Sequence, residues 1–218
     1  MSYLSKNKNS PKFSLFNIGR AGFTLTELLV SISILAVILT VIVLSQSNYN
    51  DGVDLHGVAD RISLLASQTQ SYGTGVVEFS PGSDEFTSSY GLTFSLLSPS
   101  YDKSYIFFAD RDLNGVYDGD WSCPTGGSSE CIEKSIIPRG HVISSLCVVK
   151  VSGPDECNLG RADVTYVRPS TEARITYVNT AGSIFYPEGA IGVRIILSSP
   201  KGATRSIAIY NTGQISVK

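Results

Sequence analysis

The sequence has few of the residues on which catalysis and metal binding usually depend. Its 218 residues include one methionine, one tryptophan and two histidines, His56 and His141, and only 17% of the residues are charged. Neither histidine has a second metal-type ligand at a useful spacing, which argues against a histidine-based zinc site. The chain also lacks a Gly-x-Ser-x-Gly elbow, a Walker loop and a dinucleotide-binding loop, so we expect a protein that is not an enzyme.

Long apolar runs are scarce as well, and this excludes a polytopic membrane protein. From Leu28 to Leu44 no residue is charged, and residues 23–27 extend this segment to a helix of about 33 Å, close to the thickness of a bilayer core. We therefore expect a single membrane pass. The hydrophobic content of 42% excludes a disordered chain.

Charge is distributed unevenly along the chain. Residues 1–22 contain no acid and four bases, Lys6, Lys8, Lys12 and Arg20, so this segment carries +4; since the whole chain carries −2, the remainder carries −6. A basic segment before an apolar run predicts a cytoplasmic N-terminus. The acidic remainder disfavours nucleic acid as a partner, since only scattered bases lie near the C-terminus.

One carboxylate, Glu27, stands at the beginning of the apolar run. A carboxylate deep in lipid costs roughly 2–3 kcal/mol, so its presence predicts a partner cation. Residues 22–30 read Gly-Phe-Thr-Leu-Thr-Glu-Leu-Leu-Val. This segment resembles the class III signal of type IV prepilins and type II secretion pseudopilins. A plain membrane anchor with an accidental glutamate is the alternative interpretation.

The resemblance implies a processing site and a function. A membrane peptidase would cut between Gly22 and Phe23 and methylate the new N-terminus at Phe23, which makes Glu27 the fifth mature residue and the assembly carboxylate. The implied function is that of a structural subunit, preferably minor, of a type IV pilus, competence pilus or type II secretion pseudopilus. Its implied partners are other pilin or pseudopilin subunits, the prepilin peptidase and an inner-membrane assembly platform. It would leave the cytoplasmic membrane for an extracellular or periplasmic filament.

The remaining chain indicates an α+β fold of the pilin kind. Leu55, Val58, Ile62, Leu65 and Thr69 follow helical spacing, which predicts a long helix from about 23 to 72 whose outer half packs on a sheet. Gly52 and Gly57 either mark a place where this helix bends on assembly or are simply tolerated. Extended runs separated by turn residues predict a mainly antiparallel β-rich domain, with strands at 75–80, 91–96, 104–109, 141–151, 163–167, 173–179, 191–198, 204–210 and 213–217.

Three segments follow from this interpretation. Residues 1–22 form a basic leader, residues 23–50 form the transmembrane or filament-core half of the helix, and residues 51–218 form the extracytoplasmic domain. Within that domain, residues 107–120 and 210–215 loosely resemble the minor pilins of the type II secretion H-subunit group.

Acidic side chains gather in one loop of the predicted domain. Asp-x-Asp-x-Asn-Gly-x-x-Asp matches several positions of a calcium loop, with Gly115 at the sharp turn. Position 12 is Trp121 in place of the usual glutamate. The alternative is an Asx-rich turn whose carboxylates cap their own backbone. The predicted Ca²⁺ ligands are Asp110, Asp112, Asn114, the Val116 carbonyl, Asp118 and Asp120.

All four cysteines, Cys123, Cys131, Cys147 and Cys157, lie in the predicted extracytoplasmic domain, where disulfides persist. Three pairings are open, and the local one, 123 with 131 and 147 with 157, closes two short loops. A four-thiolate zinc site is disfavoured because CxxC spacing is absent.

A second functional hypothesis remains, that of a membrane-anchored extracellular module for binding or adhesion, stabilised by calcium, that never polymerises.

Overall fold

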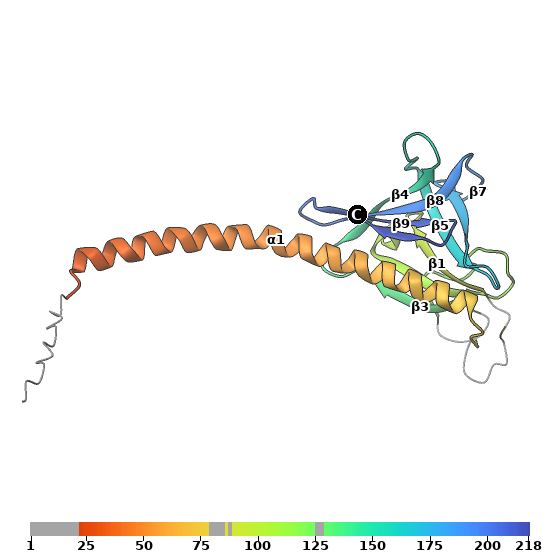
Figure 1. Ribbon diagram of the computed structural model, residues 1–218, viewed down its shortest axis with the longest axis horizontal. Coiled ribbons are helices and arrows are strands. Elements are labelled where there is room, and N and C mark those ends of the chain that lie inside the picture. Colours follow the sequence, from red (N-terminus) through yellow and green to blue (C-terminus); the bar gives the residue numbers. More distant parts are fainter. Residues whose placement is uncertain (1–21, 79–85, 87–88, 125–128) are drawn as a thin grey trace, which may run out of the picture. The chain divides into compact units, whose positions relative to one another are not determined.

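A computed structural model of the chain describes residues 22–78, 86, 89–124 and 129–218. It divides into two units, Met1–Leu44 and Ser45–Lys218, which we describe separately. The predicted leader falls on residues 1–21, which lie outside the described residues, and on Gly22. The helix α1 (Leu25–Thr74) belongs partly to each unit. Among the described residues after it, the regular elements are strands and one short 3₁₀ turn at Tyr101–Lys103 (Figure 1).

The strands of the second unit form two antiparallel sheets. The six-stranded sheet has the order β3-β2-β1-β5-β6-β7, and the four-stranded sheet has the order β10-β9-β8-β4. The fold is therefore α+β, as the sequence predicts. The strand bounds are β1 (Ser89–Ser95), β2 (Ser104–Asp110), β3 (Cys131–Ile136), β4 (Val142–Lys150), β5 (Leu159–Tyr166), β6 (Ala173–Asn179), β7 (Ile184–Phe185), β8 (Ala190–Ser198), β9 (Thr204–Tyr210) and β10 (Ile215–Val217).

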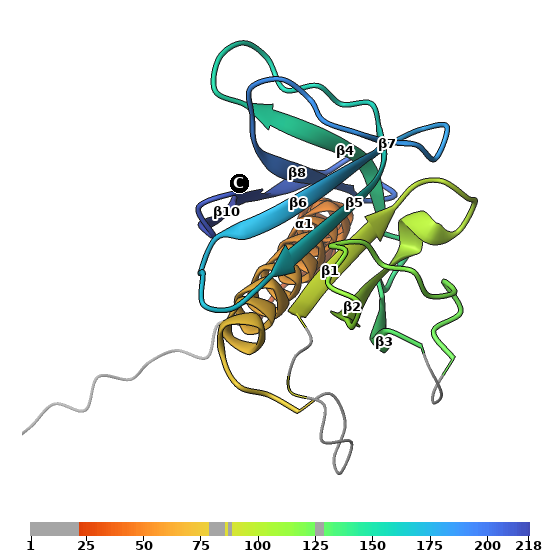
Figure 2. The same cartoon turned by 90° about the vertical axis from the view of Figure 1, so that its right-hand side faces the viewer.

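Both sheets pack against the later turns of α1, which Figure 2 shows nearly end-on beside β1, β5 and β6. The helix contributes the predicted stripe, in which Leu55, Ile62 and Thr69 are fully buried, and Ala59 and Ala66 widen it. Side chains spaced by three and four residues share one helix face, so burial of this face is what orients the helix on the sheets.

Strands β1 and β2 are buried on both faces, and the alternation of their side chains explains how. On β2, Tyr105, Phe107 and Ala109 join the core around α1, whereas Ile106 and Phe108 join a smaller cluster on the opposite face. That second cluster is completed by Tyr117 and Trp121 of the following loop. The acidic loop is thus folded back over the outer face of the six-stranded sheet.

The structure departs from the predicted strands at three places. Residues 75–78 form no strand, because they continue from the end of α1, where the Gly75 amide donates to the Ser71 carbonyl; residues 79 and 80 are not described. Strands β3 and β7 were not predicted. Both are edge strands with partly exposed side chains, so neither has the apolar alternation that reveals a buried strand.

The two glycines of α1 do not interrupt the helix. The helix runs unbroken through Gly52 and Gly57, and a Cβ atom at either position would meet nothing within 4 Å. The space around both positions would therefore admit a side chain, so close packing does not require glycine at either.

Candidate functional site

The N-terminal candidate site begins at a helix cap. The Glu27 amide donates to Thr24 Oγ1 at 3.3 Å, and Thr24 Oγ1 donates to Glu27 Oε2 at 3.5 Å. Thr24 is therefore the N-cap and Glu27 the third helical residue, which is the spacing of a capping box. The negative charge of Glu27 also lies at the positive end of the helix dipole. Glu27 thus helps to define where the helix begins, three residues after Gly22.

Beyond this cap, α1 presents apolar side chains on every face. Leu25–Val43 is long and apolar enough to cross a membrane, and none of it is buried among the described residues. Its hydroxyl groups are satisfied within the helix, because Ser31, Ser33 and Thr40 each donate to the carbonyl four residues earlier, at 2.8 to 2.9 Å. An apolar surface of this extent marks a contact with lipid or with other helices, and internally bonded hydroxyls suit either.

The second candidate site is the acidic loop between β2 and β3. Asp110, at the end of β2, is fully buried and accepts hydrogen bonds from Ser89 Oγ at 2.8 Å, the Gly115 amide at 2.9 Å and the Asn114 amide at 3.1 Å. Gly115 has φ of +82°, and a Cβ there would lie 2.8 Å from the Arg174 side chain. The sharp turn therefore requires glycine at this position.

The structure brings Asp110 and Asp112 together with Glu130, a residue that the sequence did not single out. Carboxylate oxygens from these three residues lie within 4.8 Å of one another. Glu130 is buried and accepts the Arg111 amide at 3.2 Å and the Asp118 amide at 3.0 Å. It comes from just before β3, so it supplies from the far end of the loop the carboxylate that is missing at position 12.

The other predicted ligands are arranged around this cluster. Asn114 Nδ2 donates to Asp112 at 2.8 Å and to Asp118 at 2.6 Å, so these three side chains lie close together. Asn114 Oδ1 accepts the Val116 amide, whereas Asp120 accepts the Ser122 amide at 2.9 Å. The predicted side chains thus split, because those of Asp110, Asp112, Asn114 and Asp118 surround the loop turn, whereas Asp120 caps the next turn instead.

Electrostatics within the cluster oppose ionisation. Burial raises the pKa of Asp110, against the hydrogen bonds from Ser89 and Gly115, and the neighbouring Asp112 raises it further. Burial likewise raises the pKa of Glu130, and the charges of Asp110 and Asp118 add to this effect. Oxygen ligands held together in this way are the kind that hard cations such as Ca²⁺ prefer, and a bound cation would relieve the repulsion.

Two arginines of the six-stranded sheet, Arg161 and Arg174, hold the backbone of the loop. Arg174 donates to the backbone carbonyls of Leu113 at 3.2 Å and Asn114 at 2.8 Å. Arg161 binds the buried Asp163 through two nitrogens and donates to the Tyr117 carbonyl at 3.1 Å. The loop backbone is thus fixed on β5 and β6, which leaves the carboxylates of Asp110, Asp112 and Glu130 facing one another.

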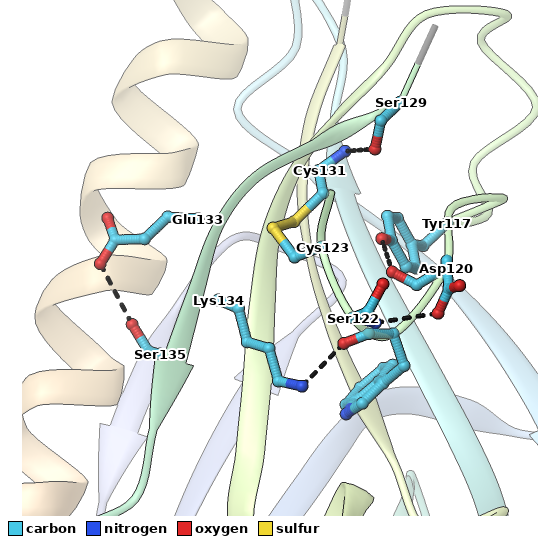
Figure 3. Close-up of a disulfide and its surroundings, with 10 residues drawn as sticks. Tyr117, Asp120, Ser122, Cys123, Ser129, Cys131, Glu133, Lys134 and Ser135 are labelled. Atoms are coloured by element: carbon cyan, nitrogen blue, oxygen red, sulfur yellow. Dashed lines mark hydrogen bonds between the residues drawn. A yellow bond between two sulfur atoms is a disulfide. The ribbon is translucent and has the colours of Figure 1, made fainter. Parts of the chain in front are cut away.

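A disulfide closes the same loop. Cys123 and Cys131 are joined, which ties the end of the loop to the first residue of β3, and Lys134 donates to the Trp121 carbonyl at 2.7 Å (Figure 3). Cys147 and Cys157 form the second disulfide, so both bridges follow the local pairing. Glu130 precedes Cys131 directly, and the disulfide therefore restrains the carboxylate that completes the cluster.

Comparison with known proteins identifies the N-terminal segment. Residues 18–43 match the family model of the prokaryotic N-terminal methylation motif. The chain therefore carries the class III signal of type IV prepilins, and the described part of the match includes the capped start of α1 and its apolar surface. No curated protein and no solved structure gives a significant match to the chain.

Proposed function

We propose that this chain is a structural subunit, of the minor kind, in a type IV pilus, competence pilus or type II secretion pseudopilus. The observation that supports this most strongly is the methylation motif at residues 18–43, which coincides with an uncovered apolar helix. Residues 1–22 are the leader, residues 23–50 form the filament core and residues 51–218 form the outer domain. A large domain with two disulfides and an acidic loop suits a specialised subunit. The chain is then a substrate of the prepilin peptidase and not an enzyme.

Processing and assembly depend on three residues in this proposal. The peptidase cuts between Gly22 and Phe23 and methylates Phe23, which creates an α-ammonium two residues before the helix. In a dry bundle of helices, Glu27 of one subunit neutralises the ammonium of a neighbour, whereas a shifted register leaves both charges unpaired. The pair therefore specifies the register of assembly. The hydroxyl of the N-cap residue Thr24 accepts a hydrogen bond from the Glu27 amide and so holds Glu27 at the helix start.

The proposed topology places the N-terminus in the cytoplasm and the domain outside the membrane. The basic leader before the apolar run favours this orientation, and two disulfides suit an oxidising compartment. The subunit then moves from the cytoplasmic membrane into the filament through the assembly platform.

Substitution of Glu27 tests this proposal. Glu27→Leu should still be cleaved after Gly22, but the chain should be lost from filaments sheared from the cells. Ser31→Leu lies one turn further along the helix and removes no charge, so this control should enter filaments normally. Unchanged assembly of Glu27→Leu would refute the role of Glu27. Absence of the wild-type chain from every filament would favour the anchored module that does not polymerise.

We also propose that the acidic loop binds Ca²⁺. Asp110, Asp112 and Glu130 supply the carboxylates, and Asn114 and Asp118 lie beside Asp112 in the same loop turn. The Val116 carbonyl is the proposed backbone ligand. The ion would stabilise the loop and the outer face of the six-stranded sheet that it covers. Calorimetric titration of the full chain in detergent with CaCl₂, compared with MgCl₂, tests this proposal; no heat of binding would contradict it.

A further inference from the structure

A small cavity lies beside the outer part of α1, where the connection from β3 to β4 passes the helix. Its volume is about 230 Å³, and all of its lining residues belong to the second unit. The helix contributes Asp54, Val58 and Arg61. The last residue of β3, Ile136, and the connection residues Arg139 and His141 line the other side. It is separate from both the methylation motif and the acidic loop.

The charged groups of this cavity leave one cation without a partner. Arg139 forms an ion pair with Asp54, so those two charges cancel. The guanidinium of Arg61 has no hydrogen bond or ion pair with any residue that the structure describes. Glu133, the acid of the neighbouring strand β3, does not line the cavity and interacts with Ser135. The cavity therefore carries one net positive charge.

The buried part of the cavity also has unused hydrogen-bonding capacity. His141 is 1% exposed, and neither of its ring nitrogens has a hydrogen-bond partner among the described residues. A buried imidazole without partners is uncommon, because buried polar groups are nearly always paired. Apolar side chains, including the buried Val58 and the exposed Ile136, complete the lining.

We propose that this cavity receives a glutamate side chain from a neighbouring subunit of the same filament, with its carboxylate bound by Arg61. A single negative charge matches the net charge of the cavity, whereas a phosphate dianion would bring a second charge toward Asp54. The volume is below the roughly 300–1,000 Å³ of sites for small molecules, so one inserted side chain suits it better. The apolar lining suits glutamate better than aspartate, because glutamate has one more methylene group.

This inference rests on the proposed function, because the occupant is another filament subunit. The motif at residues 18–43 would direct contacts between helices in the filament core. The cavity would instead direct contacts between the outer domains of neighbouring subunits. Arg61 would then determine which neighbouring subunit fits, since a partner without the acidic side chain would leave the guanidinium unpaired.

Cross-linking in assembled filaments tests the cavity. Ile136 is 70% exposed at its edge and can be replaced by a photo-reactive residue in the full chain. The cross-linked peptide should come from a neighbouring subunit and contain a glutamate. Arg61→Glu should then reduce both the cross-link and the amount of chain in sheared filaments roughly tenfold, while Arg61→Lys retains most of each. Replacing the partner glutamate with arginine should restore the assembly of the Arg61→Glu variant into filaments.

The controls separate this inference from the filament proposal. Lys218→Glu makes the same charge change at an exposed residue outside the cavity and should assemble normally. Normal assembly of Arg61→Glu, cross-links to a segment without an acid, or failure of the charge exchange would each overturn the inference alone. Absence of the wild-type chain from filaments would overturn the filament proposal as well.

Discussion

Replacement of Asp112 by asparagine should affect stability in opposite directions with and without calcium. Its carboxylate oxygen lies within 4.8 Å of those of Asp110 and Glu130. At that distance two like charges repel by about 0.9 kcal/mol even in a dielectric like that of water. Because Asp112 is exposed, we use this lower limit. In EDTA, the free energy of unfolding of Asp112→Asn should therefore be equal to that of the wild type or higher by up to about 1 kcal/mol.

Calcium should reverse this order. Extracellular calcium modules bind with dissociation constants of about 10⁻⁴ to 10⁻³ M, so calcium at about 10 mM would add about 1.4 to 2.7 kcal/mol to the wild type. That gain corresponds to an increase in Tm of about 3 to 11 °C for a domain of this size. Asp112→Asn loses a charged ligand, and we expect it to retain less than half of the gain.

Thermal unfolding of the full chain in detergent, followed by circular dichroism in EDTA, CaCl₂ and MgCl₂, measures these differences. Asp60→Asn is the matched control, because Asp60 is an exposed acid on α1 that pairs with His56, far along the chain from the loop. It should show the full calcium gain. The reasoning is refuted if calcium and magnesium raise Tm equally, or if Asp112→Asn gains as much from calcium as the wild type does.

Three further predictions concern stability. Ile62→Ala removes a fully buried side chain of α1 and should lower the free energy of unfolding by about 2–5 kcal/mol in urea titrations, whereas Leu64→Ala, 70% exposed, should change it little. Serine at both Cys123 and Cys131 should cost about 2.6 kcal/mol by loop entropy and should also weaken the calcium gain; an unchanged gain would show that the bridge does not restrain the cluster. Since folding raises the pKa values of Asp110 and Glu130, the folded chain binds protons more tightly at these two carboxylates. Stability in EDTA should therefore fall as the pH rises from their ordinary values of 3.8 and 4.5 toward the raised ones, and calcium should reduce that fall.

Local patterns in the sequence account for the parts of the fold that are regular. The apolar stripe on α1 predicts which face meets the sheets, because helical spacing alone determines it. The alternation of Tyr105, Ile106, Phe107 and Phe108 likewise places neighbours on opposite faces of β2. What the pattern does not contain is the identity of the layer above each face, which here is the acidic loop on one side and α1 on the other.

Glu130 shows why the candidate cation site could not be completed from the sequence. A linear calcium loop places its last carboxylate at position 12, where this chain has Trp121, so the loop pattern does not extend to Glu130. Residue 130 returns to the cluster through the pairing of β2 with β3, whose register shifts between Phe107 and Phe108. The available signal was the short spacing between Cys123 and Cys131, since a local disulfide brings the residue before Cys131 back toward the loop.

The cavity at Arg61 could not be found from the sequence for a similar reason. Its residues come from α1, from Tyr105 of β2, and from the end of β3 with the connection that follows it, and β3 is an edge strand without a recognisable pattern. His141 lies directly before β4, and its burial without a hydrogen-bond partner among the described residues depends on packing, which the sequence pattern does not contain.

The intact mass and N-terminal sequence of the protein isolated from its own membranes test the central proposal most directly. We expect a chain that begins at Phe23 and carries one additional methyl group. A chain that retains residues 1–22 would contradict processing by a prepilin peptidase and would favour an anchored module. A chain cut after the apolar run, near Ser47, would instead be a secreted domain with two disulfides.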